Sequence, residues 1–185
     1  MQLAAPPHPV AIIGGTNGKG STVAFVAALL TAVGQRVGVF TSPHLQRYNE
    51  RIRIDGVEAT DAEIVASFER IDAARGTTTL TYFEFGTLAA LDLFARARVD
   101  FAVLEVGLGG RLDATNLIDA DVAAVCSVGL DHTDWLGDSL DAIGQEKAGI
   151  FRAGRPAVLG SEDLPPSVLA HVRTIGARPI VFGRD

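Results

Sequence analysis

A glycine-rich segment between an apolar run and a helical pattern constrains this chain more than any other feature. The apolar run is Val10 to Ile13, and between it and the helical pattern the chain reads Gly14-Gly15-Thr16-Asn17-Gly18-Lys19-Gly20-Ser21-Thr22. A glycine-rich turn between a strand and a helix directs several backbone N–H groups at one anion, and the helix dipole and Lys19 add positive charge. The segment therefore predicts a binding site for the phosphates of a nucleotide.

The spacing departs from the usual phosphate-binding pattern, which is Gly, four residues, Gly-Lys and then Ser or Thr. Ile13 stands where the first glycine is expected, and Gly20 separates Lys19 from the hydroxyls of Ser21 and Thr22. Taken alone, the segment also allows a second interpretation, a turn capped by Ser21 with a solvated lysine. The rest of the sequence has to decide between these two interpretations.

The composition is that of an ordinary globular domain and argues against several classes of protein. The length of 185 residues suffices for one domain with a substantial core. A net charge of −6 argues against a nucleic-acid-binding protein, which normally carries a basic face. A single cysteine, Cys126, excludes an internal disulfide. No apolar stretch is long enough to span a membrane, and residues 1–9 lack the pattern of a secretion signal, so we expect a cytoplasmic protein.

Short apolar runs alternate with helical patterns along the chain, which predicts an α/β fold with a doubly wound, mostly parallel sheet flanked by helices. The runs suit strands that are buried on both faces. The expected strands are 10–14, 36–40, 101–106, 122–128, 156–159 and 179–182. The expected helices are 21–33, 62–74 with Asp61 as the cap, 83–98, 139–150 and 166–175.

Four polar clusters follow expected strands, at the point where each strand ends. They are the glycine-rich segment, Thr41 to His44, Glu105 to Asn116, and Asp131 to Asp134. The carboxyl ends of parallel strands meet at one edge of a sheet, where ligands of this fold class bind. We therefore expect the four clusters to form one site.

Several side chains in these clusters could serve a magnesium nucleotide. Glu105 is the best carboxylate for Mg²⁺, although it could instead pair with an arginine such as Arg111, and Ser42 offers a neutral oxygen. His132 is a poorer ligand for so hard a cation and could be a hydrogen-bonded structural residue. Lys147 near the end of an expected helix could be an ordinary surface lysine.

Taken in order, five groups of motifs resemble the folylpolyglutamate synthases and dihydrofolate synthases, within the Mur ligase superfamily. They are Gly15-Thr16-Asn17-Gly18-Lys19-Gly20-Ser21; Thr41-Ser42-Pro43-His44-Leu45 with Asn49-Glu50-Arg51-Ile52; Thr81-Tyr82-Phe83-Glu84; residues 104–116; and Asp131-His132-Thr133 with Glu146-Lys147-Ala148-Gly149-Ile150. Five motifs in the order of the family are a specific signal. The hydroxyl that arrives late, after Gly20, matches the variant of the phosphate loop found in this family.

The resemblance implies a P-loop NTPase-like domain of the Mur ligase central type. It also implies ATP-dependent ligation of L-glutamate to dihydropteroate, to reduced folates or to both. ATP would first phosphorylate the substrate carboxylate to an acyl phosphate, which the glutamate amine would then attack. The implied cofactors are ATP and Mg²⁺ at two sites, and the implied partners are small molecules, with no nucleic acid and no membrane. A monomer is the expected state.

Transferred position by position, the resemblance gives each motif a role. The nucleotide would be bound by Gly15, Thr16, Asn17, Gly18, Lys19, Gly20, Ser21 and Thr22. The metal ligands would be Ser42, Glu105 and His132, and Lys147 would be a carbamylated lysine. The residues acting in catalysis would be Lys19, Lys147 and His132, and the pterin would be held by Thr81, Phe83, Asp113 and Ala114.

Members of the family are longer than this chain and carry a second α/β domain that binds glutamate. We therefore expect residues 1–185 to form the ATP-binding domain, to lack the C-terminal glutamate-ligase domain and to be inactive in ligation alone. Two alternatives remain open. One is a Mur-type ligase of peptidoglycan precursors, and the other is a nucleotide-binding module without ligase activity.

Overall fold

The computed structural model describes residues 6–185, so residues 1–5 of the N-terminal segment considered above lie outside the described part. The strands are β1 (Val10–Gly14), β2 (Val37–Phe40), β3 (Ile52–Ile54), β4 (Val57–Glu58), β5 (Phe101–Glu105), β6 (Val122–Val125), β7 (Pro156–Leu159) and β8 (Arg178–Val181). The α-helices are α1 (Lys19–Ala32), α2 (Asp61–Arg75), α3 (Tyr82–Ala97), α4 (Thr133–Leu136), α5 (Leu140–Ala148) and α6 (Pro166–Thr174). Two 3₁₀-helices, η1 (Tyr48–Arg51) and η2 (Ala114–Leu117), lie in loops.

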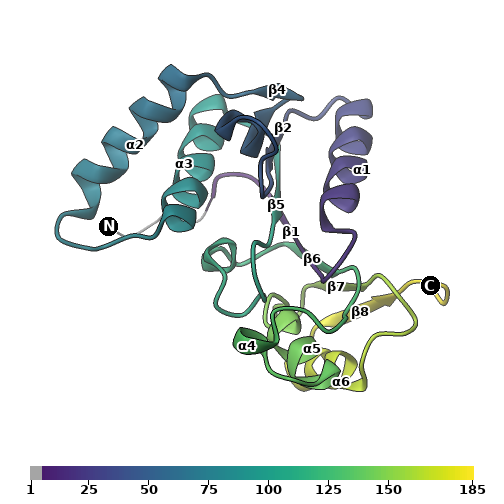
Figure 1. Cartoon of the computed structure of the whole chain (residues 1–185). Helices are drawn as coiled ribbons and strands as arrows, with labels where there is room; N and C mark the ends of the chain where they lie inside the picture. The colour runs from purple at the N-terminus through teal and green to yellow at the C-terminus, as the bar shows by residue number, and fades with distance from the viewer. Residues whose placement is uncertain (1–5) are drawn as a thin grey trace.

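The strands form one sheet in the order β4-β3-β2-β5-β1-β6-β7-β8, with helices on both faces (Figure 1). β1 pairs in parallel with β5 on one side and with β6 on the other, while β3 and β4 add an antiparallel edge. The doubly wound, mostly parallel α/β fold predicted from the sequence is therefore confirmed. After β1 the chain continues on one side of this strand, with β2 to β5, and then crosses to the other side, with β6 to β8. Proteins of this fold class bind their ligands where the strand order reverses in this way.

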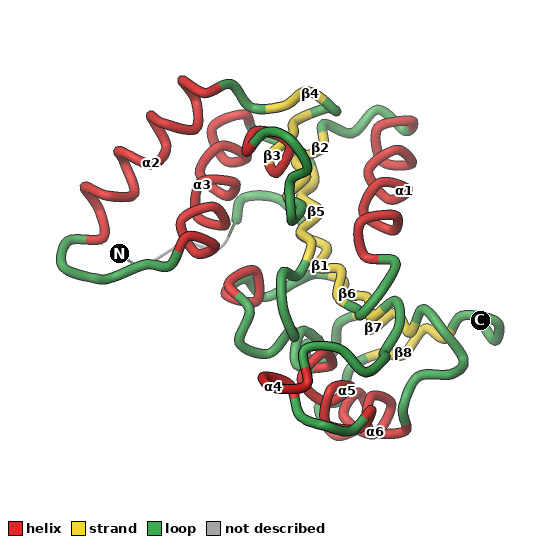
Figure 2. Tube along the Cα trace, viewed as in Figure 1, coloured by secondary structure: helices red, strands yellow, loops and turns green. Residues whose placement is uncertain are grey.

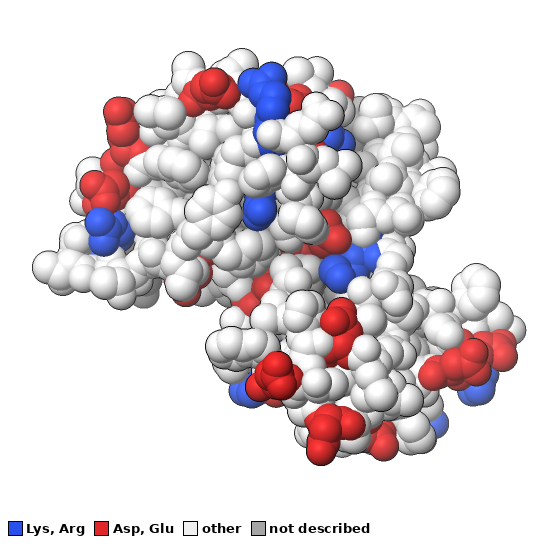
Figure 3. Space-filling view, viewed as in Figure 1, with Lys and Arg blue, Asp and Glu red and all other residues white. Residues whose placement is uncertain are grey.

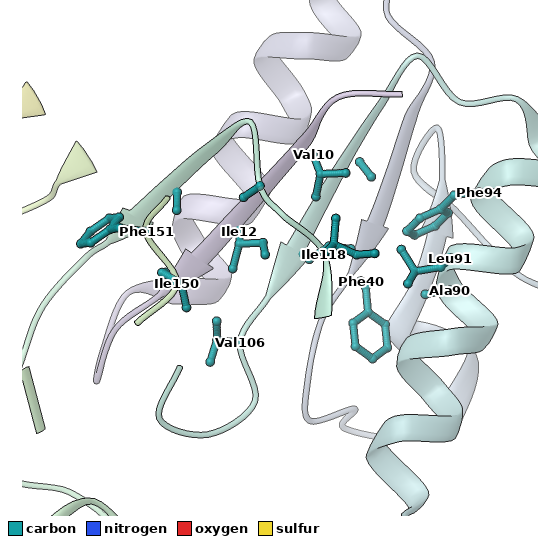
Figure 4. Packing of buried hydrophobic residues seen from close by; sticks show 14 of the residues in the cluster. Val10, Ile12, Phe40, Ala90, Leu91, Phe94, Val106, Ile118, Ile150 and Phe151 are labelled. Carbon is teal, nitrogen blue, oxygen red and sulfur yellow. The ribbon is translucent and has the colours of Figure 1, made fainter. Parts of the chain in front are cut away.

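Side chains alternate across the sheet and join two separate cores. Val10 and Ile12 of β1 lie in the larger core with Phe40 and with Phe94 of α3, as Figure 4 shows. Ala11 and Ile13 face the other way and pack with Val23 of α1 and its neighbours. β1 is buried at every position, so its sequence is apolar throughout rather than alternating.

The helices divide between the two faces of the sheet (Figure 2). α1 packs against β5, β2 and β1 on one face, and α3 packs against β2 and β3 on the other. α2 lies on α3, and α5 pairs with α6 near β7 and β8. Within residues 6–185, no helix combines the length and the apolar character needed to cross a membrane.

Several boundaries differ from those predicted, for local reasons. α1 begins at Lys19 rather than Ser21, because Gly18 adopts a left-handed conformation (φ 85°) and takes the capping position. Thr60, not Asp61, caps α2, since its side chain accepts a hydrogen bond from the N–H of Glu63. The strand expected to reach residue 128 ends at Val125, beyond which the chain bonds to the glycine-rich loop.

Candidate active site

The glycine-rich loop joins the carboxyl end of β1 to the start of α1 and contains two glycines with positive φ angles. Gly15 has φ 146° and Gly18 has φ 85°, conformations that favour glycine. A Cβ on Gly15 would lie 3.2 Å from both Cβ and N of Cys126, so the loop can approach the strand beside it only without a side chain. The sequence places glycine where the backbone requires it.

The first turn of α1 is open to an anion. Its N-cap is Gly18, which has no side chain to cap the helix, and the first turn contains no acidic residue. The first N–H groups of a helix have no partner within the helix and carry its positive dipole end. Helical bonding begins with the N–H of Thr22, which donates to the carbonyl of Gly18 at 2.9 Å. The amides of residues 18–21 therefore have no partner within the helix and are the groups that an anion could reach.

Two loop amides that were predicted to serve the nucleotide are engaged within the protein. The N–H of Thr16 donates to the carbonyl of Ser127 at 2.8 Å, and the N–H of Asn17 donates to Oγ of Ser127 at 2.9 Å. The hydroxyl of Thr22 donates to the carbonyl of Gly18 at 2.9 Å and lies 3.2 Å from Sγ of Cys126. These residues shape the loop, while Ser21 keeps an exposed hydroxyl.

Lys19 carries the loop's full positive charge. Its Nζ donates to the carbonyls of Gly15 at 3.0 Å and Thr16 at 3.3 Å, so the ammonium lies over the loop that precedes it. Its charge also affects two other site residues, because it lowers the pKa of both Glu105 and Lys147. Lys19 is therefore electrostatically coupled to β5 and to α5.

Glu105 ends β5 beside the loop and is 5% exposed. Its Oε2 accepts a hydrogen bond from the N–H of Ser42 at 3.1 Å, and a Cβ on Gly20 would lie 3.8 Å from its Oε1. Burial raises the pKa of Glu105, an effect that the N–H of Ser42 and the charge of Lys19 partly oppose. The alternative pairing with an arginine does not occur, since Arg111 pairs with Glu146.

Lys147 is a buried cation near the end of α5, only 4% exposed, and not the surface lysine that the sequence alone allowed. Burial, followed by the positive charge of Lys19, lowers the pKa of its amine to about 8, although the carboxylate of Asp131 opposes both effects. A lysine with this pKa is partly neutral near neutral pH, which makes its amine a nucleophile. Carbamylation requires a neutral amine, and Lys147 meets this chemical condition.

His132 is the third of the expected metal ligands. It is exposed, precedes α4 in a left-handed conformation (φ 50°), and its Nε2 lies 3.6 Å from Oδ2 of Asp131. No group of three or more His, Cys, Asp or Glu side chains that could hold a metal ion occurs among residues 6–185. Ser42 and Glu105 are joined by a hydrogen bond, and the role expected for His132 stays a prediction.

Two of the four expected pterin residues, Asp113 and Ala114, line a cavity of about 520 Å³ between α2, α3 and η2. Both oxygens of Asp113 are engaged: Oδ2 accepts from the N–H groups of Gly107 and Leu108, and Oδ1 accepts from N–H and Oγ1 of Thr115. Asp113 therefore orders the loop after β5. A ligand would contact this carboxylate in addition to these hydrogen bonds and not in place of them.

The other two expected pterin residues do not line this cavity. Oγ1 of Thr81 caps α3, accepting a hydrogen bond from the N–H of Glu84 at 3.2 Å. The ring of Phe83 lies 5.7 Å from that of Phe40, and a Cβ on Gly107 would come within 2.7 Å of it. Both residues have structural contacts that account for them without a ligand.

Arg51 is a site residue that reasoning from single side chains missed, although it lies in one of the quoted motifs. It is 8% exposed, its Nε donates to Nδ1 of His44 at 2.8 Å, and its guanidinium lies 5.5 Å from the ring centre of Tyr48 and 5.3 Å from that of Tyr82. No ion pair involves it within the described part of the chain. A guanidinium without a carboxylate partner has the geometry to bind an anionic ligand through paired hydrogen bonds.

Acidic and basic side chains lie next to each other at the waist between the part that holds α1 to α3 and the part that holds α4 to α6 (Figure 3). The loop, Glu105 and Lys147 are contributed by the ends of β1, β5 and α5. A glycine-rich loop at a helix N-terminus, a buried carboxylate and a lysine of lowered pKa are the features typical of domains that bind a nucleoside triphosphate with its metal.

The comparison with known families identifies this class more closely. The sequence model of the Mur ligase middle domain matches residues 13–184. The chain therefore belongs to the Mur ligase middle domain family.

Curated relatives support the resemblance seen in the motifs. The chain is 53% identical over 172 residues to the dihydrofolate synthase/folylpolyglutamate synthase of Escherichia coli strain K12, an alignment that covers 92% of this chain and 41% of the relative. It is 41% identical over 180 residues to the folylpolyglutamate synthase of Lacticaseibacillus casei, covering 92% of this chain and 42% of the relative. The chain thus spans about two fifths of the length of these relatives.

Solved structures have the same fold. A structure of Escherichia coli FolC in complex with DHPP and ADP superposes with a TM-score of 0.95 at 50% identity, covering 97% of this chain and 44% of that one. A bifunctional folylpolyglutamate synthase/dihydrofolate synthase from Yersinia pestis, complexed with AMPPNP and a manganese ion, gives a TM-score of 0.91 at 55% identity, covering 96% and 43%.

Proposed function

We propose that this chain carries the nucleotide-binding and pterin-binding half of an ATP-dependent ligase, which joins L-glutamate to dihydropteroate, to reduced folates or to both. The observation that carries the proposal is that the glycine-rich loop and the buried Glu105 meet at the edge where β1 and β5 end, where a Cβ on Gly20 would lie 3.8 Å from Oε1 of Glu105. The relatives named as dihydrofolate and folylpolyglutamate synthases support the substrate class. Because ATP is the co-substrate, the proposal places the protein in the cytoplasm.

The chemistry requires two anions to meet. A carboxylate is a poor acyl electrophile, so the γ-phosphoryl group of ATP is transferred to it, which gives an acyl phosphate with a good leaving group. The amine of glutamate then attacks the acyl carbon, and phosphate leaves. Catalysis of such a transfer consists mainly of positioning and charge stabilisation. The amides of residues 18–21 and the ammonium of Lys19 are suited to hold the phosphates.

The donor set at Glu105 fits magnesium. A carboxylate and a hydroxyl are hard oxygen ligands, and Glu105 and Ser42 are already joined by a hydrogen bond. We propose that these two residues hold the metal, which supplies charge neutralisation on the phosphates, and that His132 contributes at a second site. Nearby Lys19 adds positive charge on the same side of the loop.

We propose that the pterin occupies the cavity of about 520 Å³ that Asp113 and Ala114 line, with Thr81 and Phe83 shaping the helix beside it. The cavity is also lined by apolar side chains, among them Leu80 and Leu88, which suit a flat heterocycle. Arg51 would bind a carboxylate of the substrate, because its guanidinium is buried and lacks an acidic partner.

We further propose that Lys147 is carbamylated. The ammonium first loses one proton, and the neutral amine then forms a bond to carbon dioxide and loses a second proton, so that a buried cation becomes an anion. Burial supports this by lowering the pKa of the amine to about 8. The resulting carbamate oxygens would be further hard ligands for magnesium.

Thermal unfolding of the chain in the presence of different ligands tests the proposed function. A ligand present at 100 times its Kd and bound only by the folded state adds about 2.7 kcal/mol of stability. We expect Mg-ATP and dihydropteroate to raise Tm, and a UDP-muramyl substrate to have no effect. A response to the UDP-muramyl substrate alone would favour a peptidoglycan ligase. A response to nucleotide without any to pterin substrates would favour a nucleotide-binding module.

A further inference from the structure

The segment that follows β6, residues 126–129, runs beside the phosphate loop and is hydrogen-bonded to it through Cys126, Ser127 and Gly129. The N–H of Cys126 donates to the carbonyl of Gly14 at 2.9 Å, and the N–H of Thr16 donates to the carbonyl of Ser127 at 2.8 Å. These bonds extend the pairing of β1 with β6 beyond the ends of both strands. The loop is therefore held by a neighbour 110 residues away in the sequence.

Ser127 adds a side-chain contact that this backbone pairing does not provide. Its Oγ accepts from the N–H of Asn17 at 2.9 Å and donates to the carbonyl of Asn17 at 2.9 Å. One hydroxyl has one donor and two acceptor sites, so a serine can satisfy both polar groups of a single residue. The two bonds together fix the peptide groups on both sides of Asn17, immediately before Gly18.

A reciprocal pair of bonds lies beside this one. Oγ1 of Thr16 accepts from the N–H of Gly129 at 3.0 Å and donates to the carbonyl of Gly129 at 3.3 Å. A loop side chain thus holds the backbone of the segment, while a segment side chain holds the backbone of the loop. The same segment leads directly to Asp131 and His132.

We propose that Ser127 is a positioning residue for phosphate binding. Its hydroxyl holds the backbone of Asn17, so that the amides of residues 18–21 stay directed toward the phosphates instead of sampling other orientations. Preorganised donors bind an anion without the cost of ordering a loop. The inference rests on the proposed nucleotide binding and adds to it a residue that no motif indicated.

Variants at this position test the proposal in the 185-residue chain. Ser127→Ala removes both bonds to Asn17, so we expect the Kd of Mg-ADP measured by calorimetry to rise about tenfold or more. Ser127→Thr keeps the hydroxyl and should bind within about threefold of wild type. Thr174→Ala, which removes an exposed hydroxyl bonded to the carbonyl of Ala170 within α6, is the matched control and should leave the Kd unchanged.

A second measurement separates this inference from the proposed function. Hydrogen exchange of the Asn17 amide, followed by NMR without nucleotide, should accelerate about tenfold in Ser127→Ala and return to the wild-type rate in Ser127→Thr. If the alanine variant does not fold, Ser127→Cys, with a similar size and a weak donor, carries both measurements. An unchanged Kd or an unchanged exchange rate would overturn the proposal. Failure of the wild-type chain to bind Mg-ADP would instead count against the proposed function.

Discussion

Oε2 of Glu105 accepts a hydrogen bond from the backbone N–H of Ser42 at 3.1 Å, which joins the carboxyl end of β5 to the loop that follows β2. The bond orients one oxygen of the carboxylate and leaves Oε1 beside Gly20 of the phosphate loop. The carboxylate is buried at a raised pKa, so its charge is unfavourable unless a cation is near. A buried carboxylate of this kind is expected where a bound metal ion balances its charge.

Glu105→Gln should therefore weaken metal binding without weakening the fold. The amide oxygen can still accept from Ser42, but the charge is lost, so we expect the Kd of Mn²⁺ in the presence of ADP to rise about tenfold or more. Removing a buried carboxylate should leave the free energy of unfolding unchanged or higher at pH 7. Electron paramagnetic resonance measures free Mn²⁺, and urea unfolding measures stability. Glu69→Gln, on the exposed side of α2, is the control. Unaltered Mn²⁺ affinity in Glu105→Gln would remove Glu105 from the metal site.

Lys147 should make stability depend on pH. Its pKa is about 8 in the folded protein and takes its ordinary value of 10.5 when unfolded. A depressed pKa contributes stability that is fully present above 10.5 and is lost as pH falls through about 8. Compared with Lys147→Met, the wild-type free energy of unfolding should therefore rise by up to about 3 kcal/mol across this range. Urea titrations in buffer free of carbon dioxide measure the difference. A difference that does not change with pH would mean that Lys147 titrates as an ordinary lysine.

Carbamylation of Lys147 can be observed directly, because Lys19 and Lys147 are the only lysines in the chain. With ¹³C-labelled bicarbonate at pH 8, we expect a carbamate signal in the carbon NMR spectrum. Lys147→Arg should abolish this signal, since arginine stays protonated, and Lys19→Arg should retain it. Persistence of the signal in Lys147→Arg would assign it to another amine and refute the proposal for this residue.

The sequence predicted the main strands and helices because their patterns are long and local. The apolar run of β1 and the helical pattern of α3 are examples. The antiparallel strands β3 and β4 were missed, since three and two residues are too few to show a period. The N-cap of α2 was also predicted incorrectly. Thr60 and Asp61 are both favourable N-cap residues, and only the backbone conformation shows which of them caps the helix.

The position of a site residue was predictable from the sequence where the residue stands at the end of a predicted strand. Glu105 and the loop beside Lys19 meet because parallel strands end at one edge. The burial of Lys147 and Arg51 was not predictable, since both residues are covered by parts of the chain distant from them or by aromatic rings. Nor was the bond between Ser127 and Asn17, which joins residues 110 positions apart. The roles of Thr81, Phe83 and His132 stay predictions.

Arg51 should be needed for the pterin substrate and not for the nucleotide. In Arg51→Met an apolar chain of similar length replaces the guanidinium, and the lost contacts with His44 and two tyrosine rings are offset by removal of an unpaired buried cation. We expect stability within about 1 kcal/mol of wild type. Calorimetry should show dihydropteroate binding weakened at least about tenfold, and Mg-ADP binding unchanged. Arg53→Met, which removes a half-exposed partner of Glu58, is the control. Equal losses for both ligands would indicate a general disturbance of the site.

Gly110 lies where the loop after β5 meets the end of α5, and its replacement should disturb Lys147. A Cβ there would lie 2.8 Å from the carbonyl oxygen of Glu146 and 2.9 Å from that of Lys147. Both contacts are with backbone, so no side chain can move aside. Gly110→Ala should lower the free energy of unfolding by about 1 to 3 kcal/mol and shift the titration of Lys147.

The matched variant is Gly20→Ala, at which a new Cβ would lie 3.8 Å from Oε1 of Glu105, an ordinary contact distance. Gly20 is helical, and alanine there should raise stability by about 0.5 kcal/mol because it restricts the unfolded chain. Urea unfolding of both variants at pH 7 should therefore give changes of opposite sign. Destabilisation of the same size in both variants would mean that tight contact with α5 is not what requires glycine at position 110.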